Sequence, residues 1–253
     1  TVGMMSVPAN QNYNNERGIT PNLSDGPNLW GDPIDYNAGA YMGPGAIDMT
    51  WGLNGSYDIG GGNGKINLTL FEGVGGDNTA VPPADYDTVL FQSVALNWDN
   101  SVDAFGVEGL GITVCYVMIA ADDGGDAPNM ISIGGTYALK ELGLTFALEY
   151  CMNANWPAMA NGTPITEAAE DNKSSLISLS VDYAKDAFGA CLTMEILAGV
   201  GDVTADTLTR MALLGEWAYA ENAKLLLEYA SYSFAEVDTE NMTQIGLGTR
   251  VTF

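Results

Sequence analysis

The sequence contains no histidine and few positive charges. Eight Lys and Arg residues stand against 32 Asp and Glu residues, which gives a formal net charge of -24. Without histidine, Ser–His and Cys–His dyads, histidine general bases and histidine-ligated metals are excluded. A phosphate backbone needs clustered cations, so nucleic acid is not expected as a partner. An enzyme with this sequence would have to work with carboxylates.

Cysteines and long apolar runs are also scarce. Cys115, Cys151 and Cys191 match neither a closely spaced zinc motif nor a paired disulfide framework, so we expect three small buried residues. The longest uninterrupted apolar run is residues 114–121, far short of the roughly 20 residues of a membrane helix. No transmembrane helix is therefore expected. The first residue is Thr1 and no charged-then-apolar leader is present, so we expect a processed or truncated product.

Period-two alternation of apolar and small or polar residues fills most of the chain from Ile47 onward. The segment 177–183, Ile-Ser-Leu-Ser-Val-Asp-Tyr, is the clearest case, and the segments 51–58, 131–139 and 210–219 repeat it. This spacing is typical of strands with one apolar face. We count eleven strands from Ile47 to Phe253, and residues 1–7 supply one more. The sequence predicts a single domain, residues 1–253, of about twelve antiparallel strands.

Short and long connections alternate along the chain between these segments. The short ones are residues 60–64, 140–143, 185–189 and 220–223, with 99–108 a longer member of the class. The long polar ones are residues 73–87, 121–128, 153–173, 201–206 and 235–240. An even number of strands places both termini on the side of the short turns. Residues 8–45 form a long loop that either folds inward and narrows the interior of the sheet or serves as a surface cap or a latch to another subunit.

Aromatic residues recur at one level of the predicted sheet. Every second strand runs toward a short turn and carries an aromatic residue on its apolar face near that end. Rings at one height around a closed sheet are typical of the girdle where lipid headgroups meet water, while Leu, Ile, Val and Met face acyl chains. The predicted girdle consists of Tyr57, Trp98, Tyr137, Tyr183, Tyr219 and Phe253.

The opposite face of the strands carries ionisable residues, which a dry core accepts only when they are paired. A water-filled lumen hydrates them at little cost. Closure of the sheet lets every backbone N–H and C=O group inside a bilayer form a hydrogen bond, and only helices and closed barrels achieve this. We therefore predict an all-β, antiparallel, up-and-down transmembrane β-barrel. Its predicted pore-lining residues are Asp58, Glu149, Asp182, Glu195, Arg210, Glu216, Glu228 and Arg250.

The last segment, TQIGLGTRVTF, alternates apolar residues up to the terminal Phe253. It resembles the last strand of Gram-negative outer-membrane β-barrels, without matching a particular porin subfamily. The resemblance implies a bacterial outer-membrane location, periplasmic short turns, extracellular long loops and insertion by the barrel-insertion machinery through this strand. Porins of this type are often trimers, and the outward small residues Gly55, Gly135 and Gly215 permit close approach of two walls.

The predicted function is that of an outer-membrane porin, a passive diffusion channel for small hydrophilic solutes. About twelve strands give a bore between filled eight-stranded barrels and open sixteen-stranded porins. Inward carboxylates outnumber inward Arg210 and Arg250, so cations are expected to be preferred. Arg210 and Glu216 either face each other across the bore or pair with neighbours. No cofactor or metal is expected, because the acidic clusters at 85–87 and 122–126 lack calcium-loop spacing.

Two other classes of function stay open. The first is a structural or adhesive outer-membrane barrel with a plugged lumen. The second is a secreted β-sandwich, either an adhesin or a β-glucan hydrolase. Residues 236–240, Glu-Val-Asp-Thr-Glu, resemble the catalytic E-x-D-x-E strand of jelly-roll β-glucan hydrolases. That motif lies mid-sequence in those enzymes, whereas only a terminal strand follows it here, and enzymatic outer-membrane barrels rely on a histidine. No enzyme activity is therefore expected.

Overall fold

The computed structural model of this chain describes residues 2–8, 46–71, 93–118, 129–154, 159–160, 163–164, 173–198, 207–235 and 241–252. Phe253, most of segment 8–45, the carboxylate motif at 236–240 and most of the predicted long connections lie outside these residues. Within the described ranges almost every residue belongs to a strand or to a short turn between strands. Among them no helix is long and apolar enough to cross a membrane.

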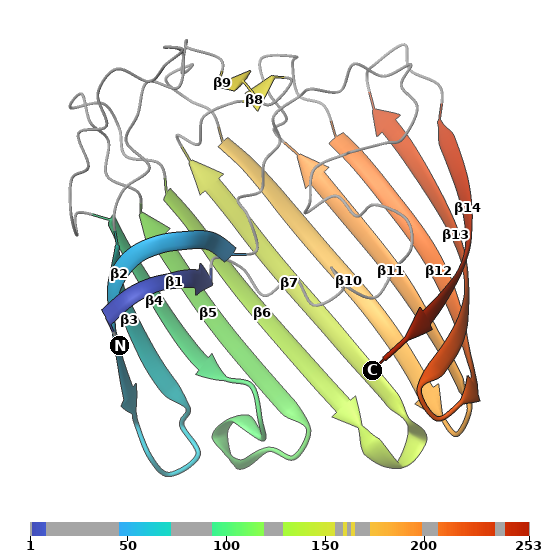
Figure 1. Cartoon of the computed structure of the whole chain (residues 1–253), viewed down its shortest axis with the longest axis horizontal. Coiled ribbons are helices and arrows are strands. Elements are labelled where there is room, and N and C mark those ends of the chain that lie inside the picture. Colours follow the sequence, from blue (N-terminus) through green and yellow to red (C-terminus); the bar gives the residue numbers. More distant parts are fainter. Residues whose placement is uncertain are drawn as a thin grey trace.

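One antiparallel sheet contains twelve strands in chain order, as Figure 1 shows. The small hairpin β8 (Met159–Ala160) and β9 (Thr163–Pro164) is separate from it. The twelve strands are β1 (Val2–Pro8), β2 (Ala46–Asp58), β3 (Lys65–Phe71), β4 (Ser93–Asn100), β5 (Leu110–Met118), β6 (Asn129–Leu139), β7 (Leu144–Ala154), β10 (Lys173–Lys185), β11 (Phe188–Ala198), β12 (Thr207–Ala220), β13 (Ala223–Ala235) and β14 (Met242–Val251).

The up-and-down order and the strand count confirm the predicted fold class. Every pair of sequence neighbours in the sheet is antiparallel, and β7 pairs directly with β10. The ladder order begins at β1 and ends at β14, and no ladder in the described part of the chain joins these two edge strands. The sheet described here is therefore an open one with the strand order of an up-and-down barrel.

The predicted short turns are confirmed at one end of the sheet (Figure 1). They include the one-turn helices η1 (Ala104–Gly106) and η2 (Lys140–Leu142). Gly143 ends η2 with φ at 67°, and a Cβ atom there would lie 2.3 Å from the carbonyl oxygen of Ala184. The Ala184 N–H donates to the Gly143 carbonyl at 2.8 Å. Glycine is required here because the turn adopts the left-handed region and touches the next hairpin.

The apolar face of the sheet is the exposed one. Leu179 is 42% exposed and Leu213 is 54% exposed, whereas their inward neighbours Ser180 and Ala212 are 4% exposed. The last strand, β14, repeats this alternation over its whole length. A soluble sandwich requires the reverse, with Leu, Ile and Val meeting in a dry interior between two sheets. Because all twelve long strands belong to one sheet with its apolar side chains exposed, the sandwich alternative is wrong.

Replacement of Leu179 by Arg tests whether lipid covers this face. Leu179 lies at the middle of β10, where we expect an Arg to lower the free energy of unfolding in lipid vesicles by about 2–4 kcal/mol. The matched control is Asn222→Arg in the tight turn between β12 and β13, where the expected change is about 0–1 kcal/mol. Denaturant titration in vesicles measures both, and an equal cost at the two positions would contradict lipid contact at Leu179.

Candidate functional site

A single row of paired residues crosses the inner face of the sheet from one end to the other. It begins at Asp58, the last residue of β2 at the short-turn end, and it ends at Met242, the first residue of β14 at the opposite end. Because neighbouring strands are staggered, the row moves away from the short-turn end of the sheet from one strand to the next. We call it the charged row. Its members, strand by strand, are Asp58, Lys65, Asp99, Thr113, Gly134, Glu149, Ser178, Glu195, Arg210, Tyr232 and Met242.

Arg210 on β12 lies at the centre of a buried ionic cluster. Its Nη1 donates to Oε2 of Glu195 on β11 at 3.0 Å, and its Nη2 donates to Oε1 of Glu228 on β13 at 2.9 Å. The guanidinium carbon lies 6.0 Å from the centre of the Tyr232 ring. All three charged side chains are 3% exposed or less. The sequence left open whether Arg210 faces Glu216 across the bore or pairs with neighbouring residues, and in the structure it pairs with neighbours.

The predicted pore-lining residues divide into a buried group and a group near the short-turn end. Glu149, Asp182, Glu195, Arg210, Glu216 and Glu228 are all buried on the inner face. Lys224 Nζ donates to Oε2 of Glu216 at 3.1 Å, in a pair that is half-open to solvent. Asp58 is exposed and accepts a hydrogen bond from the Gly60 N–H, while Arg250 stands opposite Lys224 in the β13–β14 ladder.

The three cysteines are free and buried, as the sequence predicts. Cys115 and Cys151 lie on the inner face in one row of the β5–β6–β7 ladders, with Ser132 between them. The Ser132 hydroxyl donates to Oε1 of Glu149 at 2.8 Å. In the described ranges, no group of three or more Cys, Asp or Glu residues is arranged to hold a metal ion.

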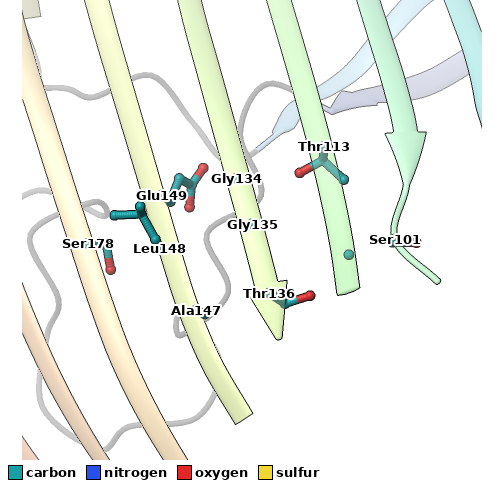
Figure 2. A pocket seen from close by; sticks show the side chains of 10 residues that line it. Ser101, Thr113, Gly134, Gly135, Thr136, Ala147, Leu148, Glu149 and Ser178 are labelled. Carbon is teal, nitrogen blue, oxygen red and sulfur yellow. The ribbon is translucent and has the colours of Figure 1, made fainter. Parts of the chain in front are cut away.

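A cavity of about 190 Å³ opens beside Glu149 on the inner face of β5, β6 and β7 (Figure 2). Glu149 lines it together with the hydroxyl residues Thr113, Thr136 and Ser178. Gly134 and Ala147 provide the space, because their side chains are too small to fill the wall. Sequence reasoning did not find this cavity, since it depends on the register of strands separated by long connections.

Five of the six predicted girdle residues lie in the described ranges, at the ends of strands that lead into short turns. Tyr57, Tyr137, Tyr183 and Tyr219 are exposed on the apolar face. Trp98 Nε1 donates to the Asn63 carbonyl at 2.9 Å, which fastens the turn after β2 to the end of β4. Further exposed aromatic residues that the sequence analysis left out lie at the same end of the sheet: Phe105, Phe146, Phe188 and Trp217.

Two solved structures share this architecture. One is a porin, with a TM-score of 0.57 and 14% sequence identity over 82% of this chain and 63% of that chain. The other is the outer membrane channel DcaP of Acinetobacter baumannii, with a TM-score of 0.58 and 10% identity over 81% of this chain and 62% of that chain. The fold is porin-like. The chain spans less than two thirds of the length of either structure.

Sequence comparisons add nothing to this likeness. No protein-family model matches the sequence, and no curated protein is significantly similar to it. The predicted resemblance to outer-membrane β-barrels is confirmed at the level of the fold, and no porin subfamily is indicated.

Removal of the Arg210 charge is expected to destabilise the protein strongly. Arg210→Met leaves Glu195 and Glu228 buried without their cation, which should lower the free energy of unfolding by about 3–5 kcal/mol. Lys140→Met removes an exposed pair with Glu108 and should cost less than about 1 kcal/mol. The triple variant Arg210→Met, Glu195→Gln, Glu228→Gln should regain most of the loss. Denaturant unfolding in detergent micelles measures all three, and an unchanged midpoint for Arg210→Met would contradict a stabilising cluster.

Proposed function

We propose that this chain forms an outer-membrane channel for passive diffusion of small hydrophilic solutes, with a preference for cations. The observation that carries the proposal is the inversion of the two faces, with large apolar side chains exposed and ionisable side chains buried inside. An exposed apolar face of this extent calls for lipid or a partner to cover it. The porin-like fold supports the bacterial outer membrane as the location of the protein.

The preference for cations rests on the residues of the inner face. Acidic groups outnumber basic ones there in the described part of the chain, and Arg210 is shared between two carboxylates. A negatively charged wall in a narrow bore raises the local concentration of cations and excludes anions. The charged row carries carboxylates near the short turns, at Asp58 and Asp99, and farther up the sheet, at Glu195.

Ion conductance in planar bilayers tests the proposal. The wild-type protein should give stepwise currents whose reversal potential in a potassium chloride gradient reports cation preference. The double variant Glu149→Gln, Asp182→Asn removes two buried inner carboxylates and should lower the ratio of K⁺ to Cl⁻ permeability. The matched double variant Glu108→Gln, Glu141→Gln removes two exposed carboxylates at the short turns and should leave that ratio close to wild type. Steps without cation preference would contradict the selectivity, and the absence of steps would contradict the channel.

A structural or adhesive barrel with a filled interior is the second candidate. The buried cluster of Arg210, Glu195, Glu228 and Tyr232 favours it, because side chains that are 3% exposed or less leave no open water around that part of the wall. Such a protein would insert into bilayers and give no current steps. The conductance measurement therefore separates the two candidates.

Two associations extend the proposal. The first is a homotrimer, in which walls meet at the outward small residues; a Cβ atom added to Gly55 would meet nothing within 4 Å. Native mass spectrometry of the detergent-extracted protein should give a trimer mass, and a monomer mass alone would contradict it.

The second association is recognition of the last strand by the barrel-insertion machinery. Deletion of Phe253 should reduce insertion in cells, and full insertion of that variant would contradict this recognition.

A further inference from the structure

A charged side chain lies on the outward face of β10, at the short-turn end of the sheet. Lys185 is the last residue of this strand, and Leu179 and Tyr183 share its face and are exposed. Lys185 is exposed as well, and among the outward strand side chains that the structure describes it carries the one formal charge. A charge on a lipid-facing wall is costly at the bilayer centre and costs little near the interface. The place of Lys185 at the end of its strand is therefore the place where lipid headgroups are expected.

Lys185 borders a group of exposed aromatic rings. It stands opposite Phe188 in the β10–β11 ladder, and Phe188 stands opposite Trp217 in the β11–β12 ladder. Phe188 is 62% exposed and Trp217 is 48% exposed. The Tyr219 ring lies 6.2 Å from the Trp217 ring, centre to centre. Directly opposite residues have Cβ atoms about 4.5–5.5 Å apart, so these four side chains form one surface, the Lys185 patch.

The Lys185 patch combines the groups that a phospholipid requires at the boundary of the bilayer. Lys185 lies two residues beyond Tyr183, about 7 Å closer to the short turns at the usual rise of a strand. Aromatic rings on a barrel wall lie at the level of the headgroups, and a lysine ammonium reaches from that level toward phosphate or water. The indole N–H of Trp217 is a hydrogen-bond donor. Rings, a donor and a cation therefore follow one another from the hydrocarbon toward the water.

Asp186 decides which headgroup suits the patch. It follows Lys185 directly, in the two-residue turn between β10 and β11, and it is exposed. Lys185 forms no ion pair with Asp186 or with any other described residue. The two side chains have a net charge of zero, so complementarity favours a headgroup that carries both a phosphate and a cation over one with a net negative charge.

We propose that the Lys185 patch binds a phospholipid through its phosphate and prefers a headgroup that also carries a primary ammonium group. The ammonium of Lys185 bonds the phosphate, and the carboxylate of Asp186, one residue closer to water, accepts from the ammonium of the headgroup. The rings of Phe188 and Trp217 contact the glycerol and the first carbons of the acyl chains. This binding requires a wall that faces lipid and requires no conduction.

Native mass spectrometry of the detergent-extracted protein, titrated with phospholipids of identical acyl chains, tests the proposal. The first lipid should bind wild type more tightly when it is phosphatidylethanolamine than when it is phosphatidylglycerol or phosphatidylcholine. Lys185→Gln should weaken phosphatidylethanolamine binding about fivefold, the usual contribution of one basic residue near headgroups. The matched control Lys140→Gln removes another exposed cation at the short-turn end, one that pairs with Glu108, and should bind as wild type does.

A second variant tests the preference between headgroups. Asp186 has a φ of 55°, a left-handed conformation that Asn adopts as readily as Asp, so Asp186→Asn keeps the turn. This variant should lose the preference for phosphatidylethanolamine over phosphatidylglycerol and still bind both. A heat-modifiable band on electrophoresis verifies that each variant is folded.

Several outcomes would overturn the proposal. Equal phosphatidylethanolamine binding by Lys185→Gln and Lys140→Gln would exclude the patch as the site, and displacement of the lipid by an equal concentration of inorganic phosphate would make free phosphate the ligand. A wild-type preference for phosphatidylglycerol, or an unchanged preference in Asp186→Asn, would contradict the role of the headgroup ammonium. A protein that conducts ions without this lipid preference would overturn the site and leave the channel. A protein that shows the preference and gives no current would overturn the channel and leave the site.

Discussion

The hydrogen bonding of the backbone constrains everything else in this chain. A segment that meets hydrocarbon must pair every N–H and C=O group within the protein, and long antiparallel ladders do so for the inner strands of this sheet. Once the backbone is paired, each side chain of a strand has only two directions available. The apolar residues take the exposed direction and the ionisable residues take the buried one. Both the porin-like fold and the chemistry of the inner face follow from that division.

The inner face combines two kinds of wall. On β11, β12 and β13 the inner face includes large charged side chains, and Arg210 ties three strands together through two carboxylates. On β5, β6 and β7 the inward residues are small, including Gly134 and Ala147, and a cavity remains between them. The first wall braces the sheet, because Arg210 bonds carboxylates on both neighbouring strands and its loss would leave them buried without their cation. The second wall offers room and acceptors to a solute. The charged row runs across both.

Much of the fold could be predicted because strand alternation is local information. The period-two pattern around Leu179 and Leu213 predicted the exposed and buried faces correctly, and the short breaks between the alternating segments predicted the hairpins. The pairing of Arg210 with Glu195 could not be predicted from the sequence, because it depends on the register between β11 and β12, which a long connection joins. The cavity beside Glu149 was equally hidden, since it requires the registers of β5, β6 and β7 together.

The account depends most directly on which solvent meets each face. In a variant whose three cysteines are replaced by alanine, a nitroxide label can be placed at Leu213 or Leu227 on the exposed apolar face, or at Ser56 or Thr136, two inward positions that are not buried. Electron paramagnetic resonance in lipid vesicles then compares collisions with oxygen, which concentrates in hydrocarbon, and with a water-soluble nickel complex. The account predicts high oxygen and low nickel accessibility at Leu213 and Leu227, and the reverse order of preference at Ser56 and Thr136. Nickel accessibility that dominates at Leu213 and Leu227 would contradict it.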